Sequence, residues 1–161
     1  MEKLNKPNQL IAVKSNQKIT VLQRKSYNIL LKNAQNYIKF NDIEVSKDSS
    51  YNFVIDCDTV HEVAGIRKKD LDYIHKELEG LMGVIATVRD KDNKNNWTKF
   101  SLLPKIEKRD GKYYYMLIGD IVKELKEQTF FTPTNLLMIK TLTSQYSITF
   151  YELAIRYEKY K

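Results

Sequence analysis

Histidine, cysteine and tyrosine are the residues of this chain whose chemistry could cut a phosphodiester bond or hold a metal. DNA-nicking enzymes of the rolling-circle type place a tyrosine nucleophile beside a metal held by a His-apolar-His pair. The sequence has 11 tyrosines, but its two histidines, His61 and His75, stand far apart in the chain. Cys57 is the single cysteine, and these three side chains fall short of the ~4 ligands that Zn²⁺ prefers. We therefore predict no metal site, no cofactor and no catalytic residue.

Glycine spacing bears on nucleotide binding, because a phosphate-binding loop needs the pattern Gly-x-x-x-x-Gly-Lys. The glycines stand at positions 65, 80, 83, 111 and 119, so this pattern does not occur. Nucleotide hydrolysis is therefore unsupported, and we predict a protein that is not an enzyme. The lone cysteine cannot close an intramolecular disulfide, which suits a reducing cytoplasm.

Basic residues outnumber acidic ones by 27 to 20, which gives a net charge of +7 and a pI of about 9.3. This balance favours a polyanionic partner without choosing between nucleic acid, an anionic membrane and an acidic protein. The 161 residues, 42% of them apolar, can bury one sizeable core. No stretch approaches the ~18 apolar residues of a membrane span, and the start lacks a secretory signal. We expect a cytoplasmic protein, without membrane attachment, with a flexible arm over residues 1–15 and one domain over residues 16–161.

The basic residues that could contact phosphates fall into three groups. One is the run from Arg67 to Lys69, the second surrounds a long polar hairpin tip at residues 90–96, and the third surrounds Lys108. Long cationic side chains at such places bind DNA favourably, because they release counterions and because the minor groove has a negative potential. Charges also decorate ordinary solvated turns, and that alternative stays open. The predicted DNA-binding residues are Arg67, Lys68, Lys69, Lys76, Arg89, Lys91, Lys94, Lys99, Lys108 and Arg109.

Helical periodicity places the elements that must position these cations. Thr20 and Gln23 have the form of a capping box, and apolar residues then recur at helical spacing, which predicts a helix over residues 21–38. Residues 51–55 have the aromatic and β-branched content of a short strand.

A helix-turn-helix unit is predicted after that strand. We expect Asp58 to cap a short helix, Gly65 to supply the turn, and Asp70 to begin a second helix with apolar residues on one face. The second helix of such a unit is the one normally offered to the major groove. Any packed pair of helices joined by a glycine gives the same letters, so the pattern is of moderate specificity.

The face of the second helix opposite its leucines argues against deep major-groove reading. That face is predicted to hold Asp72, Tyr73, Lys76 and Glu79, so it is not basic. Acidic side chains close to phosphates cost repulsion. If any part of this module contacts DNA, we expect the run Arg67 to Lys69 to bind the phosphates of one strand.

The pattern beyond residue 83 is typical of strands. We predict strands over residues 84–88, 97–103 and 113–118, with a turn at residues 108–111, and hence a three-stranded antiparallel wing. A short helix over residues 120–125 and a helix with Thr132 as its cap and Pro133 at its first position should follow. A last helix is expected from Ser144. The fold class is therefore α+β, a winged helix closed by C-terminal helices.

The segment from Leu142 to Leu153 resembles the helix that closes the first winged-helix domain of iteron-binding plasmid replication initiator (Rep) proteins. The order of predicted elements resembles that domain over nearly the whole chain, and Lys14-Ser15-Asn16 also fits. Phe150 departs from the leucine of the family pattern. The signature residues are Tyr146, Ser147, Tyr151, Glu152 and Leu153.

The resemblance implies a function as well as a fold. In that family a second winged helix makes the principal contacts with double-stranded origin repeats called iterons, and the first mediates dimerisation and adds phosphate and minor-groove contacts. We therefore expect a homodimer, iteron DNA and host replication proteins as partners, a role in copy-number control, and a second winged helix beyond Lys161. The alternatives are a stand-alone winged-helix transcriptional regulator and a protein-interaction module without DNA binding.

Overall fold

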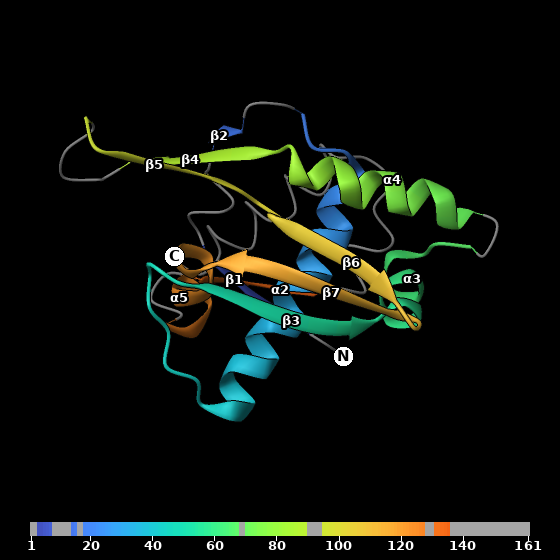
Figure 1. The fold of residues 1–161 in the computed structure, drawn as a ribbon, viewed down its shortest axis with the longest axis horizontal. Coiled ribbons are helices and arrows are strands. Elements are labelled where there is room, and N and C mark those ends of the chain that lie inside the picture. The colour runs from blue at the N-terminus through green and yellow to red at the C-terminus, as the bar shows by residue number, and fades with distance from the viewer. Residues whose placement is uncertain are drawn as a thin grey trace.

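A computed structural model describes residues 3–7, 14–15, 18–67, 70–89, 95–127 and 131–135 (Figure 1). The described chain combines helices with antiparallel sheets, which confirms the predicted α+β class. The elements are β1 (Lys3–Pro7), β2 (Lys14–Ser15), α2 (Val21–Asn41), β3 (Ser50–Asp56), α3 (Cys57–Ala64), α4 (Leu71–Met82), β4 (Ile85–Arg89), β5 (Trp97–Ser101), β6 (Lys105–Arg109), β7 (Lys112–Ile118), α5 (Gly119–Glu127) and β8 (Phe131–Asn135).

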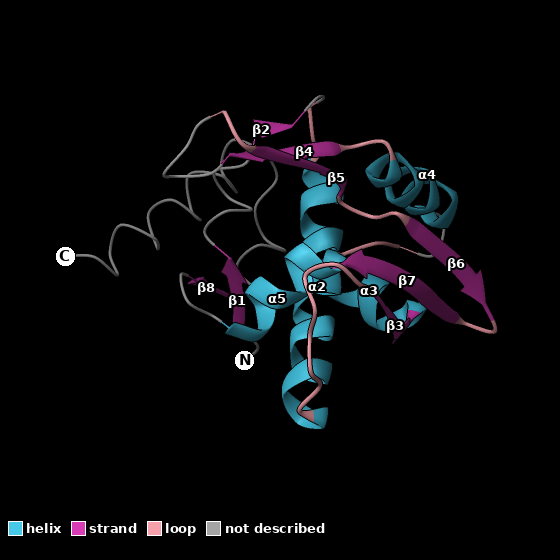
Figure 2. Cartoon of the chain, turned by 60° about the vertical axis from the view of Figure 1, so that its left-hand side comes forward, coloured by secondary structure: helices cyan, strands magenta, loops and turns pink. Residues whose placement is uncertain are grey.

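Helix α2 is the centre of the domain. The predicted capping box is confirmed, because Gln23 N donates to the Thr20 hydroxyl over 3.1 Å and Thr20 N donates to Gln23 Oε1 over 3.0 Å. Leu30, Leu31 and Ala34 are fully buried. The sheet β3-β7-β6 lies on one side of α2, and α5 with the β1-β8 pair lies on the other (Figure 2). This central helix therefore organises the core.

Strands β3, β7 and β6 form a three-stranded antiparallel sheet with β7 in the middle. Alternation along β7 buries Tyr113 and Tyr115 on the face toward the core and leaves Tyr114 half-buried. Asp110 (φ 53°) and Gly111 (φ 75°) join β6 to β7, which are the positive φ angles of a tight hairpin turn. Strand β6 was predicted only as a basic hairpin tip.

The hairpin of β4 and β5 belongs to a separate sheet, in the order β2-β4-β5. The predicted wing is therefore three-stranded and antiparallel, but its third strand is β2 and the strand at residues 113–118 was assigned to it wrongly. Leu102 and Leu103 are buried immediately after β5, and Leu102 N donates to the Val84 carbonyl over 3.1 Å. This anchoring directs the following chain into the other sheet.

The helix-turn-helix prediction is confirmed by α3 and α4, with Gly65 (φ 78°) ending α3 in the left-handed conformation. The cap of α3 was predicted wrongly: Asp56, not Asp58, stands at the N-cap, because β3 runs directly into the helix. Ile74 and Leu78 of α4 are buried, as its apolar face predicts.

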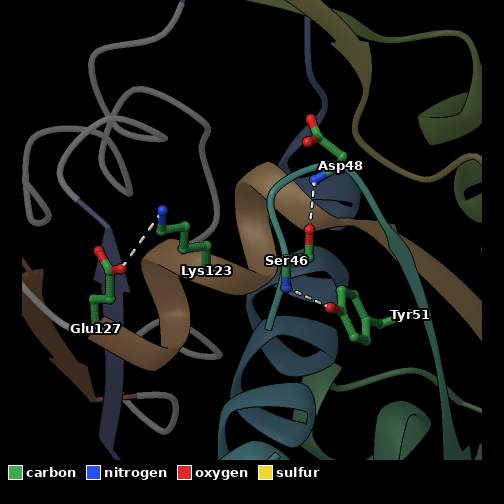
Figure 3. A network of polar contacts seen from close by, with 5 residues as sticks. All are labelled: Ser46, Asp48, Tyr51, Lys123 and Glu127. Carbon is green, nitrogen blue, oxygen red and sulfur yellow. Dashed lines mark hydrogen bonds and ion pairs between the residues drawn. The ribbon is translucent and has the colours of Figure 1, made fainter. Parts of the chain in front are cut away.

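The connection from α2 to β3 is held against the start of α5. Ser46 N donates to the Tyr51 hydroxyl over 2.6 Å, and Asp48 N donates to the Ser46 hydroxyl over 3.3 Å (Figure 3). Gly119 N donates to the Ser49 carbonyl over 2.6 Å. Within α5, Lys123 lies 3.9 Å from Glu127. The helix predicted at residues 120–125 is confirmed and is slightly longer.

Strand β8 contradicts the helix predicted to begin at Thr132 and Pro133. These residues pair antiparallel with β1, Thr132 opposite Lys6 and Pro133 opposite Asn5. Proline is tolerated in such a two-stranded edge, so long-range pairing outweighed the local helix-start signal. Two parts of the segment 1–15, expected as an arm, thus form the paired strands β1 and β2.

The helix expected from Ser144 and the signature at residues 146–153 lie outside the described residues. In the part of the chain that the structure describes, no helix has the length and apolar character needed to cross a membrane.

Candidate nucleic-acid interface

The wing hairpin of β4 and β5 carries one candidate contact surface. Trp97 is 56% exposed, and Lys99 Nζ lies 5.0 Å from the centroid of the Trp97 ring. In the strand register, Arg89 stands opposite Trp97, and Thr87 stands between Lys99 and Lys14 of β2. The hairpin therefore brings cationic positions around one exposed aromatic ring.

The inner side of the same hairpin fixes it to the domain. Ala86 is fully buried, and its register partner Phe100 packs partly buried against the core. Ser101 Oγ donates to the Met82 carbonyl over 2.8 Å, at the end of α4. The wing is thus anchored at the helix-turn-helix, and its outer side is presented to solvent at Trp97 and Lys99.

A second basic surface lies where β6 turns into β7. Lys108 and Arg109 are exposed, and the Arg109 guanidinium lies 4.5 Å from the centroid of the Tyr114 ring. Glu107 stands 3.7 Å from Arg109. A hydrogen bond to Tyr114 and the charge of Glu107 raise the pKa of Arg109, so its positive charge is permanent. The nearby Glu107 carboxylate partly offsets the attraction of Arg109 for a phosphate group.

The turn between α3 and α4 is the third basic location. Arg67 is exposed, but its Nε donates to Asp70 Oδ2 over 3.1 Å. Lys68 and Lys69 lie outside the described residues, as do Lys91 and Lys94 of the wing tip and the side chain of Arg89. Lys76 is exposed on α4 beside Asp72 and Glu79, so the predicted non-basic character of that face is present.

These candidate residues do not form one continuous patch. The end of β4 at Arg89 and the β6-β7 turn lie toward opposite ends of the described domain (Figure 1). The α3-α4 turn lies at the same end as the β6-β7 turn in both views (Figures 1 and 2). A duplex that met all of these cations would have to run along the whole length of the domain.

Helix α4 is tied to the start of α2. The Thr20 hydroxyl donates to Glu77 Oε2 over 2.8 Å, and Gln23 Nε2 donates to the Glu77 carbonyl over 3.2 Å. A Cβ placed on Gly80 would lie 2.5 Å from Gln23 Nε2, so glycine permits this close approach of the two helices. The position of α4 is therefore linked to the segment that leads from β2 into α2.

Beneath the helix-turn-helix, α3 and α4 meet the sheet at one hydroxyl group. His61 Nε2 lies 2.7 Å and His75 Nε2 lies 3.1 Å from the Tyr113 hydroxyl. Burial, His75 and Lys108 lower the pKa of His61, against the opposing charge of Asp58. This arrangement brings together two histidines that are far apart in sequence.

Cys57 is buried close to the same cluster, and burial raises the pKa of its thiol. Among the residues that the structure describes, no group of three or more His, Cys, Asp or Glu side chains is arranged to hold a metal ion. The cluster is therefore a set of hydrogen bonds that joins the helix-turn-helix to β7.

Residues 3–155 match the family described as "Initiator Replication protein, WH1". The chain belongs to this family of replication initiators. The crystal structure of the MSBI1.176 WH1 domain, described as a replication protein isolated from a multiple sclerosis patient, is similar at 10% identity and a TM-score of 0.45. That similarity covers 84% of this chain and 95% of the MSBI1.176 chain. No curated protein matches the sequence.

Family membership confirms the resemblance predicted from the sequence and supports a plasmid replication initiator role for this WH1 domain. Sequence reasoning placed Trp97 in a strand without pairing it with Lys99 as a candidate contact, and it missed the cluster around Tyr113. Trp97 had a signal, because it is the single tryptophan and stands two residues from Lys99 in a strand. The cluster around Tyr113 had no signal in the sequence, because its contacts join two helices to a strand that is distant in sequence.

Proposed function

We propose that this WH1 domain supports origin binding by a plasmid replication initiator, through phosphate and minor-groove contacts at iteron DNA, and that it also forms the homodimer. The domain has no catalytic role in this proposal. The observation that carries it is the wing: an anchored hairpin with Lys99 exposed beside Trp97, in a chain of net charge +7. Contacts with phosphates release counterions, so binding should weaken steeply with salt.

The charge of α4 shapes the proposed mode of contact. Asp72 and Glu79 stand exposed with Lys76 on the face that a recognition helix would present, and these carboxylates would repel phosphates. Basic side chains on the wing and beside the α3-α4 turn are better placed to follow the backbone. Base reading then falls to a second winged helix, as the family resemblance implies.

The proposed dimer surface is the outer face of the sheet β3-β7-β6. In the register, Val54 of β3 and Glu107 of β6 flank Tyr114 of β7, and the next row on this face holds Met116. Val54 is 44% exposed, whereas Tyr114 and Met116 are half-buried. An exposed apolar patch surrounded by charges is typical of an interaction surface. Trp97 stands on the other sheet and is not part of this face.

A switch between dimers and origin-bound monomers would make copy number depend on initiator concentration. Dimers would be inactive in replication, and monomers would bind iterons and recruit host replication proteins. Such a switch is a population shift between two arrangements. The contacts of His61 and His75 with Tyr113 of β7 are a route by which a changed packing at the sheet β3-β7-β6 would reach the helix-turn-helix.

Binding to labelled origin duplex, titrated with salt, tests the DNA role. Replacing Arg67, Lys68 and Lys69 together with alanine should weaken binding equally for origin and scrambled duplexes, and should lower the slope of log K against log salt. Lys39→Ala, in the last turn of α2, is the matched control. No binding to either duplex at low salt would contradict the proposal and favour a protein-interaction module. Strong specific binding by this domain alone would favour a transcriptional regulator.

A further inference from the structure

Trp97 occupies an unusual place for the single tryptophan of a small domain. Its side chain is 56% exposed on β5, whereas the core contains aliphatic residues and the aromatic residues Tyr27, Phe53, Tyr113 and Tyr115. Exposed tryptophan gives up the large stabilisation that burial of an indole brings. The fold therefore gains little from an indole at this position, and the exposed ring is accessible to a ligand.

Lys99 and two further basic register positions lie near the indole. Lys99 is two residues away on the same strand, so both side chains leave the same side of β5, and its ammonium group lies 5.0 Å from the ring centroid. Arg89 is the register partner of Trp97 on β4, and Lys14 is aligned with Thr87 and Lys99 across the sheet. Aromatic rings interleaved with cations are typical of surfaces that bind single-stranded nucleic acid.

We propose that Trp97 is a stacking platform for an unpaired base of single-stranded DNA, and that Lys99 binds the neighbouring phosphate. This inference rests on the proposed origin-binding function and extends it to the strand that is exposed when the duplex opens. In a duplex the face of each base is covered by its neighbours. An indole can therefore stack on a base only where pairing and stacking are lost.

The wing is suited to this task because its inner side is fixed. Ala86 is buried and Phe100 packs against the core, so the hairpin that carries Trp97 is fixed at its base. The apolar face with Val54 and Tyr114 lies on the other sheet. Strand binding at Trp97 and dimerisation at that sheet would therefore use different surfaces.

The single tryptophan makes a direct spectroscopic test possible. Stacking of a base on the indole should quench its fluorescence when short oligo(dT) is added to the protein, while a duplex at equal phosphate concentration should quench it much less. Binding of labelled oligo(dT), followed by anisotropy, should be weakened about 5- to 150-fold by Trp97→Ala, the range that stacking on one base provides. Trp97→Phe should retain most of the affinity.

Two further variants separate stacking from general effects. Lys99→Gln should lower the salt slope for oligo(dT) by about 0.7, the value for one phosphate contact on a single strand. Tyr73→Ala removes an aromatic side chain that is also 56% exposed, on α4, and should change neither quenching nor affinity. Because Trp97 is exposed, circular dichroism of Trp97→Ala should match the parent protein, and Trp97→Phe provides the comparison if it does not.

The outcomes distinguish this inference from the function on which it rests. Duplex binding combined with unquenched tryptophan and unchanged oligo(dT) affinity in Trp97→Ala would overturn the stacking role alone. Failure to bind either oligo(dT) or duplex would overturn the DNA-binding function as well. Quenching of the parent protein by oligo(dT), together with a lower salt slope in Lys99→Gln and a weakened anisotropy-measured affinity in Trp97→Ala, would support the inference.

Discussion

His61 Nε2 lies 2.7 Å from the hydroxyl of Tyr113, and this contact joins the first helix of the helix-turn-helix to the central strand of the sheet. His75 of α4 reaches the same hydroxyl over 3.1 Å. One hydroxyl can donate to one imidazole and accept from the other. The arrangement therefore holds α3, α4 and β7 together best when at least one imidazole is neutral.

Stability should fall as the medium becomes acidic, in part through His61. Burial, His75 and Lys108 lower its pKa in the folded state, while Asp58 acts in the opposite direction. The unfolded chain then binds a proton more readily than the folded one, so this contribution is present above the ordinary histidine pKa of about 6.5 and is lost below it. His61→Gln keeps a group that can bond Tyr113 but does not titrate. Its melting temperature should fall less than that of the parent between about pH 7 and pH 5.5; an equal fall would assign the acid sensitivity to other groups.

Removing the shared hydroxyl should cost stability at every pH. Tyr113→Phe leaves both imidazoles without their common partner in a half-buried site, and a lost partner of this kind costs about 1–3 kcal/mol. Urea unfolding would measure the change. Tyr114→Phe, on the outer face of the same strand, is the control and should cost less than about 1 kcal/mol. Equal effects of the two substitutions would show that the cluster is not a structural link.

Gly119 should tolerate no side chain. A Cβ there would lie 2.6 Å from the carbonyl oxygens of both Lys47 and Ser49, so the α2-β3 connection would have to move. We expect Gly119→Ala to lower the free energy of unfolding by about 3 kcal/mol. Gly111→Ala meets no atom within 4 Å and is strained only by its φ of 75°, which should cost about 1 kcal/mol. The reverse order of these two losses would contradict the steric argument.

A charge on the outer face of the sheet β3-β7-β6 should oppose dimerisation. Val54→Arg places a cation beside Tyr114, on the edge strand β3 of this face, and burying it in an interface would weaken dimerisation at least about tenfold, or 1.4 kcal/mol. Analytical ultracentrifugation over a concentration series would measure this. Phe40→Arg, at a position on α2 that is 90% exposed, should leave association unchanged. A parent protein that stays monomeric at high micromolar concentration would end the dimer proposal itself.

Local patterns in the sequence were sufficient for the elements whose signals lie within a few neighbouring residues. The capping box at Thr20, the turn at Gly65 and the apolar face of α4 depend on contacts three or four residues apart, or on the φ of a single glycine. The acidic exposed face of α4 followed from the same periodicity. Such features can be inferred because their physical causes are local.

Pairings between distant segments could be settled only by folding of the whole chain. Three features join residues that are far apart in sequence. They are the pairing of β2 with the wing, the pairing of Pro133 with Asn5, and the contacts of His61 and His75 with Tyr113. The alternating pattern of a strand specifies which side is buried but not which strand lies beside it. The packing of the shared core around α2 selects among the competing strand pairings.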